Sequence, residues 1–80
     1  MNIIYTGSAR KFLERQNNIV RERIIDAIER LPDEGDVKKL KGGKGRRLRV
    51  GIYRVVFDVH DKTVYVYEID TRGHMYRGGR

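Results

Sequence analysis

The first half of the chain has apolar residues at the spacing of a helix. From Phe12 to Leu31 they recur mostly at intervals of three and four. Ser8 is a favourable N-cap residue, and the asparagine pair at positions 17 and 18 consists of weak helix formers that divide the region. The pattern predicts a strand over residues 2–6, a short helix over residues 9–16 and a longer helix over residues 18–31.

In the second half the apolar period changes to two, the spacing of β-strands. Residues 33–45 are rich in glycine and are predicted to form a loop. Beyond them the pattern predicts strands over residues 46–50, 53–60 and 63–69, with a tight hairpin turn at Asp61 and Lys62. In the last strand valines alternate with tyrosines, and the period alone leaves open which set faces the core.

This order of elements predicts the fold class. A strand, two helices and three further strands are typical of an α+β fold in which a helical pair packs on one face of an antiparallel sheet. The chain has 80 residues and shows neither an internal repeat nor a change of composition that would divide it. We therefore expect a single domain over residues 1–80.

Alternation along the strands places three arginines together. Within residues 46–50 the leucine and the valine share one face, so Arg47 and Arg49 share the other. Within residues 53–60 the alternating apolar side chains leave Arg54 on the opposite face. If the apolar faces pack on the helices, the three guanidinium groups emerge on the exposed face of the sheet.

The charge distribution supports a binding surface on this face. The chain carries 18 basic and 11 acidic residues, a net charge of +7, and eight of the basic residues lie between Lys38 and Arg54 without an acid among them. Such a balance favours nucleic acid, an acidic protein or an anionic membrane surface as partner. A basic cluster that opens a sheet favours a built surface for polyphosphate.

Several other classes of function are disfavoured. There is no cysteine, so no disulfide or thiolate metal site is expected, and two isolated histidines do not make a zinc site. The GGKG at residues 42–45 lacks the spacing of a phosphate-binding P-loop, and no metal or cofactor is predicted. The first five residues are too short for a signal-peptide core, and no apolar run approaches the roughly 18 residues of a membrane span. We expect a soluble cytoplasmic protein without a membrane partner.

Specific motifs resemble a known family. These are KLKG at residues 39–42, RLRVGIYRVVFDV at 47–59, the following VYVYEID, and RGHMY at 72–76. Together with the helical segment from Ala9 to Leu31, they are similar to the RelE branch of the RelE/ParE toxin superfamily, and the similarity covers nearly the whole chain. The resemblance implies a type II toxin that cleaves mRNA in the ribosomal A site. It also implies a cognate antitoxin, RelB-like and acidic, that could lie across the helices and cover the basic face.

The resemblance implies roles for individual residues. Those that match the family's catalytic positions are Arg47, Arg49, Arg54, Arg72 and Tyr76. Some members carry lysine at the first two positions, where it could act as a base, whereas an arginine guanidinium has a pKa above about 12 and stays protonated. The general base therefore stays unassigned at these positions. His74 is a separate candidate for proton transfer, because a histidine side chain ordinarily has a pKa near about 6.5, and the alternative is a solvated histidine.

Further basic residues are predicted to contact RNA without taking part in the chemistry, because a flexible loop holds reactive geometry poorly. The residues predicted to bind mRNA or ribosomal RNA in this way are Lys38, Lys39, Lys41, Lys44, Arg46 and Arg77.

Three alternatives stay open. A ParE-like inhibitor of DNA gyrase would have the same fold, although the RGHMY tail favours a nuclease. A noncatalytic RNA-binding or ribosome-binding module would use the same basic face. The three strand arginines could also be ordinary solvated residues, or could pair with acids of a protein partner.

Overall fold

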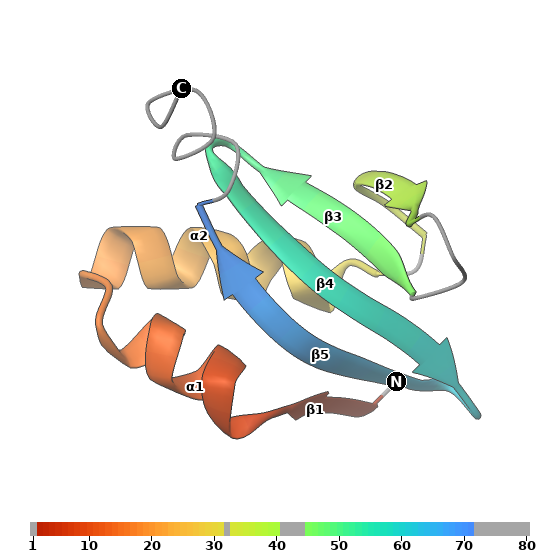
Figure 1. The fold of residues 1–80 in the computed structure, drawn as a ribbon. Helices are drawn as coiled ribbons and strands as arrows, with labels where there is room; N and C mark the ends of the chain where they lie inside the picture. The colour runs from red at the N-terminus through yellow and green to blue at the C-terminus, as the bar shows by residue number, and fades with distance from the viewer. Residues whose placement is uncertain (1, 32, 41–44, 72–80) are drawn as a thin grey trace.

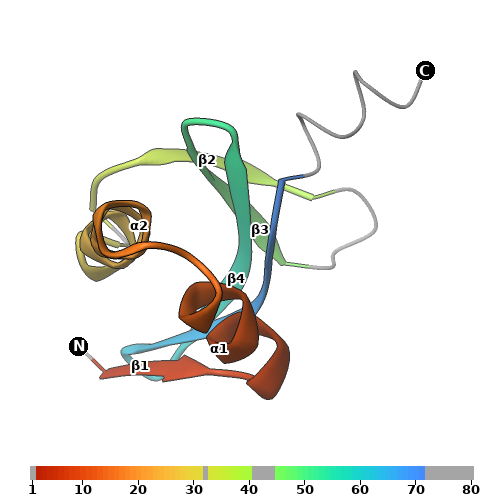
Figure 2. The ribbon, with the colours of Figure 1, turned by 90° about the vertical axis from the view of Figure 1, so that its left-hand side faces the viewer.

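The computed structural model describes residues 2–31, 33–40 and 45–71, and within them two helices lie against one face of a five-stranded sheet (Figure 1). Figure 2 shows both helices on the same side of the strands. In chain order the elements are β1 (Asn2–Tyr5), α1 (Gly7–Glu14), α2 (Asn18–Glu29), β2 (Asp36–Lys39), β3 (Arg46–Val50), β4 (Tyr53–His60) and β5 (Thr63–Asp70). The predicted α+β class is confirmed.

The sheet has the strand order β1-β5-β4-β3-β2 and is mixed. Strands β2 to β5 form an antiparallel meander, as expected for strands joined by short turns. The first strand runs parallel to the last, with Asn2 opposite Thr63 and Tyr5 opposite Val66. The prediction of a purely antiparallel sheet is wrong at this edge, because no local turn sets the direction of β1 relative to β5.

Strand β2 lies inside the segment that was predicted to be a loop, and that prediction is wrong for residues 36–39. The strand pairs with β3, with Asp36 opposite Arg49 and Lys39 opposite Arg46. Charged side chains dominate β2, so it lacks the apolar alternation that reveals a strand in a sequence. It lies at the edge of the sheet, where charged residues are common because they discourage pairing with other chains.

The first helix begins earlier than predicted. Thr6, and not Ser8, is the N-cap residue, and its Oγ1 accepts a hydrogen bond from the backbone N–H of Ala9 at 3.2 Å. The same hydroxyl donates to the carbonyl oxygen of Tyr67 at 2.7 Å. This second bond fixes the cap to β5. Its two residues are far apart along the chain, so the local sequence does not predict it. The helix consequently starts at Gly7.

The second helix starts where the sequence predicted and ends two residues earlier. Asn17 caps it, with its Oδ1 accepting a hydrogen bond from the N–H of Val20 at 2.9 Å. The last helical residue is Glu29, and Leu31 lies buried just beyond it.

Arg21 ties the two helices together at their turn. Its guanidinium donates hydrogen bonds to the carbonyl oxygens of Leu13 at 3.1 Å and Gln16 at 2.7 Å, and to Oδ1 of Asn18 at 2.8 Å. The carbonyls at a helix C-terminus have no partners within the helix and carry partial negative charge. Arg21 thus stabilises the end of α1 as well as the turn.

The core lies between the helices and the sheet. The largest fully buried side chains are those of Phe57, Ile24, Ile28, Leu48, Val55, Val64 and Val66. The two β5 valines face the core, which settles the question that the period left open. Tyr67 is 42% exposed and lies where the pairing of β4 with β5 shifts by one residue.

The β4–β5 hairpin turns at Asp61 and Lys62, as predicted. Both residues have positive φ, 49° and 60°. Two consecutive positive φ values are characteristic of a type I′ turn, whose twist matches that of the strands it joins.

Candidate nucleic-acid interface

Three arginines lie on the side of the sheet that faces away from the helices, and we call this surface the arginine face. Arg47 and Arg49 belong to β3, and Arg54 belongs to β4. Arg49 lies directly opposite Arg54, whereas the buried pair of Leu48 and Val55 lies on the other side of the sheet. The prediction that these arginines share the exposed face is confirmed.

Strand register adds two acids to this face. Asp36 on β2 is opposite Arg49, Arg49 is opposite Arg54, and Arg54 is opposite Asp70 on β5. Residues opposite each other in an antiparallel pair point to the same face. Asp36, Arg49, Arg54 and Asp70 therefore form one line across four strands, which we call the charge row, with two cations between two acids.

The strongest ion pair of the face joins β4 to β5. Nη2 of Arg54 donates a hydrogen bond to Oδ2 of Asp70 at 3.2 Å, and the two side chains are only 24% and 21% exposed. Partial burial weakens screening by solvent, so this contact is stronger than a typical surface pair.

The second ion pair of the face is weaker. Nη1 of Arg47 lies 3.9 Å from Oδ2 of Asp36, and the aspartate side chain is 62% exposed. The Arg47 side chain is only 12% exposed, but this separation is too long for a hydrogen bond, so the pair is held less firmly than that of Arg54 with Asp70.

Two guanidinium nitrogens of the face are buried without a hydrogen-bond partner among the described residues. They are Nη1 of Arg47 and Nε of Arg54. A buried charged donor that lacks a partner is costly, and such groups are rare in folded proteins. Because both atoms are shielded from solvent, an oxyanion would reach them only if these side chains moved.

Acids on β4 and β5 limit the basic area to one part of the exposed face. Glu68 is opposite Val56, and Asp58 is opposite Tyr65. Oδ2 of Asp58 lies 3.5 Å from Nε2 of His60, which is largely exposed. The arginine face is therefore bounded by negative charge toward β5.

The other predicted RNA-binding residues divide between the two sides of the sheet. Lys38 is opposite Arg47 and so belongs to the arginine face. Lys39 is opposite Arg46, and Arg46 is opposite the buried Phe57, which places both on the side of the helices. The predicted site residues that lie outside the described residues are Lys41, Lys44, Arg72, His74, Tyr76 and Arg77.

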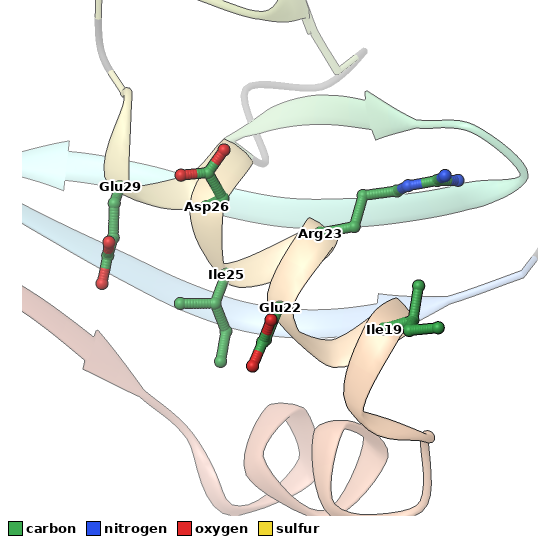
Figure 3. A pocket seen from close by; sticks show the side chains of 6 residues that line it. All are labelled: Ile19, Glu22, Arg23, Ile25, Asp26 and Glu29. Carbon is green, nitrogen blue, oxygen red and sulfur yellow. The ribbon is translucent and has the colours of Figure 1, made fainter.

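An open depression on α2 lies apart from the arginine face (Figure 3). It is lined by Ile19, Glu22, Arg23, Ile25, Asp26 and Glu29. Asp26 also pairs with Arg30, with their side-chain atoms 3.0 Å apart. Three carboxylates make this surface unsuitable for a phosphate.

Tyr5, the last residue of β1, has a perturbed ionisation. Burial, assisted by the carboxylate of Glu29, raises the pKa of the Tyr5 phenol.

Within the described ranges, no group of three or more histidine, aspartate or glutamate side chains is placed to hold a metal ion. In the same part of the chain, no helix is long and apolar enough to cross a membrane.

Solved structures with a similar fold include two toxin–antitoxin complexes. One chain of the RelB–RelE antitoxin–toxin complex from Methanococcus jannaschii is 26% identical in sequence to this chain, with a TM-score of 0.72. The match covers 96% of this chain and 99% of that one. The archaeal RelE–RelB complex from Pyrococcus horikoshii OT3 is also 26% identical with a TM-score of 0.72, covering 90% of this chain and 94% of the other. The YoeB dimer from Staphylococcus aureus shares the fold at 21% identity and a TM-score of 0.64, covering 85% of this chain and 92% of that one.

The fold and the basic sheet surface thus define a toxin of the RelE/ParE superfamily. The family model for the ParE toxin of the type II toxin-antitoxin system parDE matches residues 3–76. The chain belongs to this family of type II toxins. No curated protein matches the sequence significantly.

Proposed function

We propose that this toxin is a metal-independent, ribosome-dependent endoribonuclease that cleaves mRNA in the A site. The observation that carries the proposal is the arginine face, in which Arg47, Arg49 and Arg54 lie on the side of the sheet away from the helices and Arg49 is directly opposite Arg54. Guanidinium groups bind phosphate through planar forks of N–H donors. The similarity to RelE proteins supports the same reaction.

The reaction that fits this face is attack by the RNA on its own backbone. The 2′-oxygen of one nucleotide forms a bond to the adjacent phosphorus, and the bond from phosphorus to the 5′-oxygen of the next nucleotide breaks. The 2′-hydroxyl loses a proton and the departing 5′-oxygen gains one. The products carry a 2′,3′-cyclic phosphate, or the 3′-phosphate formed by its hydrolysis, and a 5′-hydroxyl.

The arginine face would serve this reaction by electrostatic stabilisation. Arg54 binds the scissile phosphate, and Arg49, directly opposite it, holds a second oxygen of the same group. Negative charge grows on these oxygens in the transition state, so fixed donors lower the barrier. In the proposal Arg72 stabilises or protonates the leaving oxygen and Tyr76 stacks on a base of the codon, and both lie outside the described residues.

Removing the proton from the 2′-hydroxyl calls for a different kind of side chain. A guanidinium does not accept a proton near neutral pH. His74 is the candidate in this chain, and a His74→Ala variant tests it. We expect a large loss of cleavage near neutral pH, and wild-type activity would dismiss the histidine.

An antitoxin is the expected protein partner, as in the RelB complexes of the two archaeal RelE proteins. An acidic segment would fit the arginine face, neutralise its charge and become ordered on binding. The depression on α2 is lined by three carboxylates and would repel such a segment. We therefore place the acidic part of the antitoxin on the sheet and not across α2.

A second candidate function is inhibition of DNA gyrase without RNA chemistry. The match to the ParE family model favours it, and the fold does not distinguish it from a nuclease. Under this alternative the arginine face would contact a protein or DNA.

Toeprinting on translating ribosomes separates the two functions. We expect the wild-type toxin to cut mRNA in the A site and Arg54→Ala to lower the rate by about 100-fold or more, because a donor to the transition state is lost. Lys11→Ala, an exposed basic residue on α1, is the matched control and should cleave normally. Inhibition of supercoiling by gyrase without any mRNA cleavage would favour the alternative.

A further inference from the structure

We propose that Asp70 is a positioning residue that fixes the guanidinium of Arg54 for phosphate binding. The inference rests on the proposed nuclease function and extends it to an acidic residue that does not itself touch RNA. Its basis is the charge row, in which Asp70 lies directly opposite Arg54 on the neighbouring strand.

The contact is suited to holding a side chain still. Oδ2 of Asp70 accepts a hydrogen bond from Nη2 of Arg54 at 3.2 Å, and about three quarters of each side chain is shielded from solvent. A free arginine side chain samples many rotamers, and ordering it on binding opposes affinity and rate. A carboxylate held by β5 removes that freedom before RNA arrives.

Arg49 makes such a contact necessary. It lies directly opposite Arg54, and like charges in that position repel each other. Without a counter-charge on its other side, Arg54 would be pushed away from Arg49, and the two guanidinium groups would no longer converge on one phosphate. Asp70 supplies that counter-charge from the next strand along the sheet.

The geometry also leaves donors of Arg54 available. A guanidinium has five N–H groups, and the hydrogen bond to Asp70 uses one at Nη2. Nε is buried, so the donors that remain for a phosphate oxygen are those of Nη1 and the second N–H of Nη2. Asp70 thus holds one edge of the group and need not leave when RNA binds.

The test compares the same substitution on and off the arginine face. Asp70→Asn keeps the shape of the side chain and removes its charge. Asp26→Asn is the matched control, because the Asp26 side chain is 61% exposed, pairs with Arg30 and lies on α2 apart from the arginine face. Both are assayed as purified toxins cleaving mRNA on programmed ribosomes, with kcat and KM measured separately.

If Asp70 positions Arg54, Asp70→Asn should change kcat and KM differently. We expect Asp70→Asn to lower kcat by about 10- to 100-fold, since a misplaced catalytic group costs that much. We expect KM to stay level or to fall, because removing a negative charge does not weaken the attraction of RNA. Asp26→Asn should behave as wild type. A kcat that is unchanged or raised by Asp70→Asn would overturn the proposal and make Asp70 a competitor of phosphate.

Two further measurements distinguish positioning of Arg54 from a general effect of the Asp70 charge on the fold. In an Arg54→Lys background Asp70→Asn should have little further effect on kcat, because the carboxylate acts through the guanidinium. Exchange of the Arg54 Nε–H with solvent, followed by NMR without ribosomes, should accelerate at least tenfold in Asp70→Asn. A wild type that cleaves no mRNA refutes the proposed function, whereas unchanged exchange in Asp70→Asn refutes the positioning role alone.

Discussion

Replacing Lys62 by glycine should stabilise the protein. Lys62 is the second residue of the β4–β5 turn, with φ of 60°, and its side chain is exposed. An L-residue in the left-handed region costs about 1–2 kcal/mol because Cβ crowds the following carbonyl, and glycine avoids this cost. The backbone carbonyl of Lys62 accepts a hydrogen bond from the N–H of Asn2 at 3.2 Å, and the substitution leaves that bond in place.

Glycine also gives the unfolded chain more freedom, which opposes folding by about 0.5–1 kcal/mol. The expected net gain is therefore about 0.5–1 kcal/mol in the free energy of unfolding. For a domain of this size, each kcal/mol shifts Tm by about 4–8 °C, so Tm should rise by about 2–8 °C.

Thermal and urea unfolding followed by circular dichroism would measure this change. Lys62→Ala is the control, because alanine removes the long side chain and keeps Cβ, and it should leave Tm nearly unchanged. The reasoning about the turn is refuted if Lys62→Gly lowers Tm or matches Lys62→Ala.

Three further predictions concern other parts of the fold. Gly45→Ala should lower the free energy of unfolding by about 1–3 kcal/mol in urea melts, because Gly45 has φ of 96° and a Cβ there would lie 2.9 Å from the carbonyl oxygen of Phe57; a neutral result would contradict the close approach. Arg21→Met should cost about 1–3 kcal/mol through loss of its bonds to the α1 end, and Arg21→Lys should not restore full stability, since lysine lacks the planar fork. The raised pKa of Tyr5 means that its proton is bound more tightly in the folded state, so this stability is complete below about pH 10 and is lost as the pH rises through the folded-state value. Tyr5→Phe should flatten the alkaline limb of stability against pH, and an unchanged limb would rule Tyr5 out as its source.

The parts of the fold that the sequence predicted are those with a strong period. The strands at residues 46–50 and 53–60 were located to the residue, because apolar side chains alternate along them. Strand β2 was missed because pairing with β3, and not an apolar pattern, makes residues 36–39 a strand. The cap at Thr6 was missed for a similar reason, since a bond to the distant Tyr67 holds it.

Only part of the candidate site could be predicted, because alternation along a strand is visible in the sequence whereas the register between strands is not. Local alternation was enough to place Arg47, Arg49 and Arg54 on one face. It gave no sign of Asp36 or Asp70, which reach that face only through the register of neighbouring strands. Counting charges along residues 38–54 therefore predicted a purely basic surface, whereas the folded face also carries acids.

Pairing between the first and last strands has a consequence for how this toxin is made. Residues 2–5 find their partners only at residues 63–66, so the sheet cannot close before residue 66 has been synthesised. Contacts so distant in sequence form late and slow folding. We therefore expect β1 to lack its partner during most of the synthesis of this domain, whereas the β3–β4 hairpin that carries the three arginines can pair earlier.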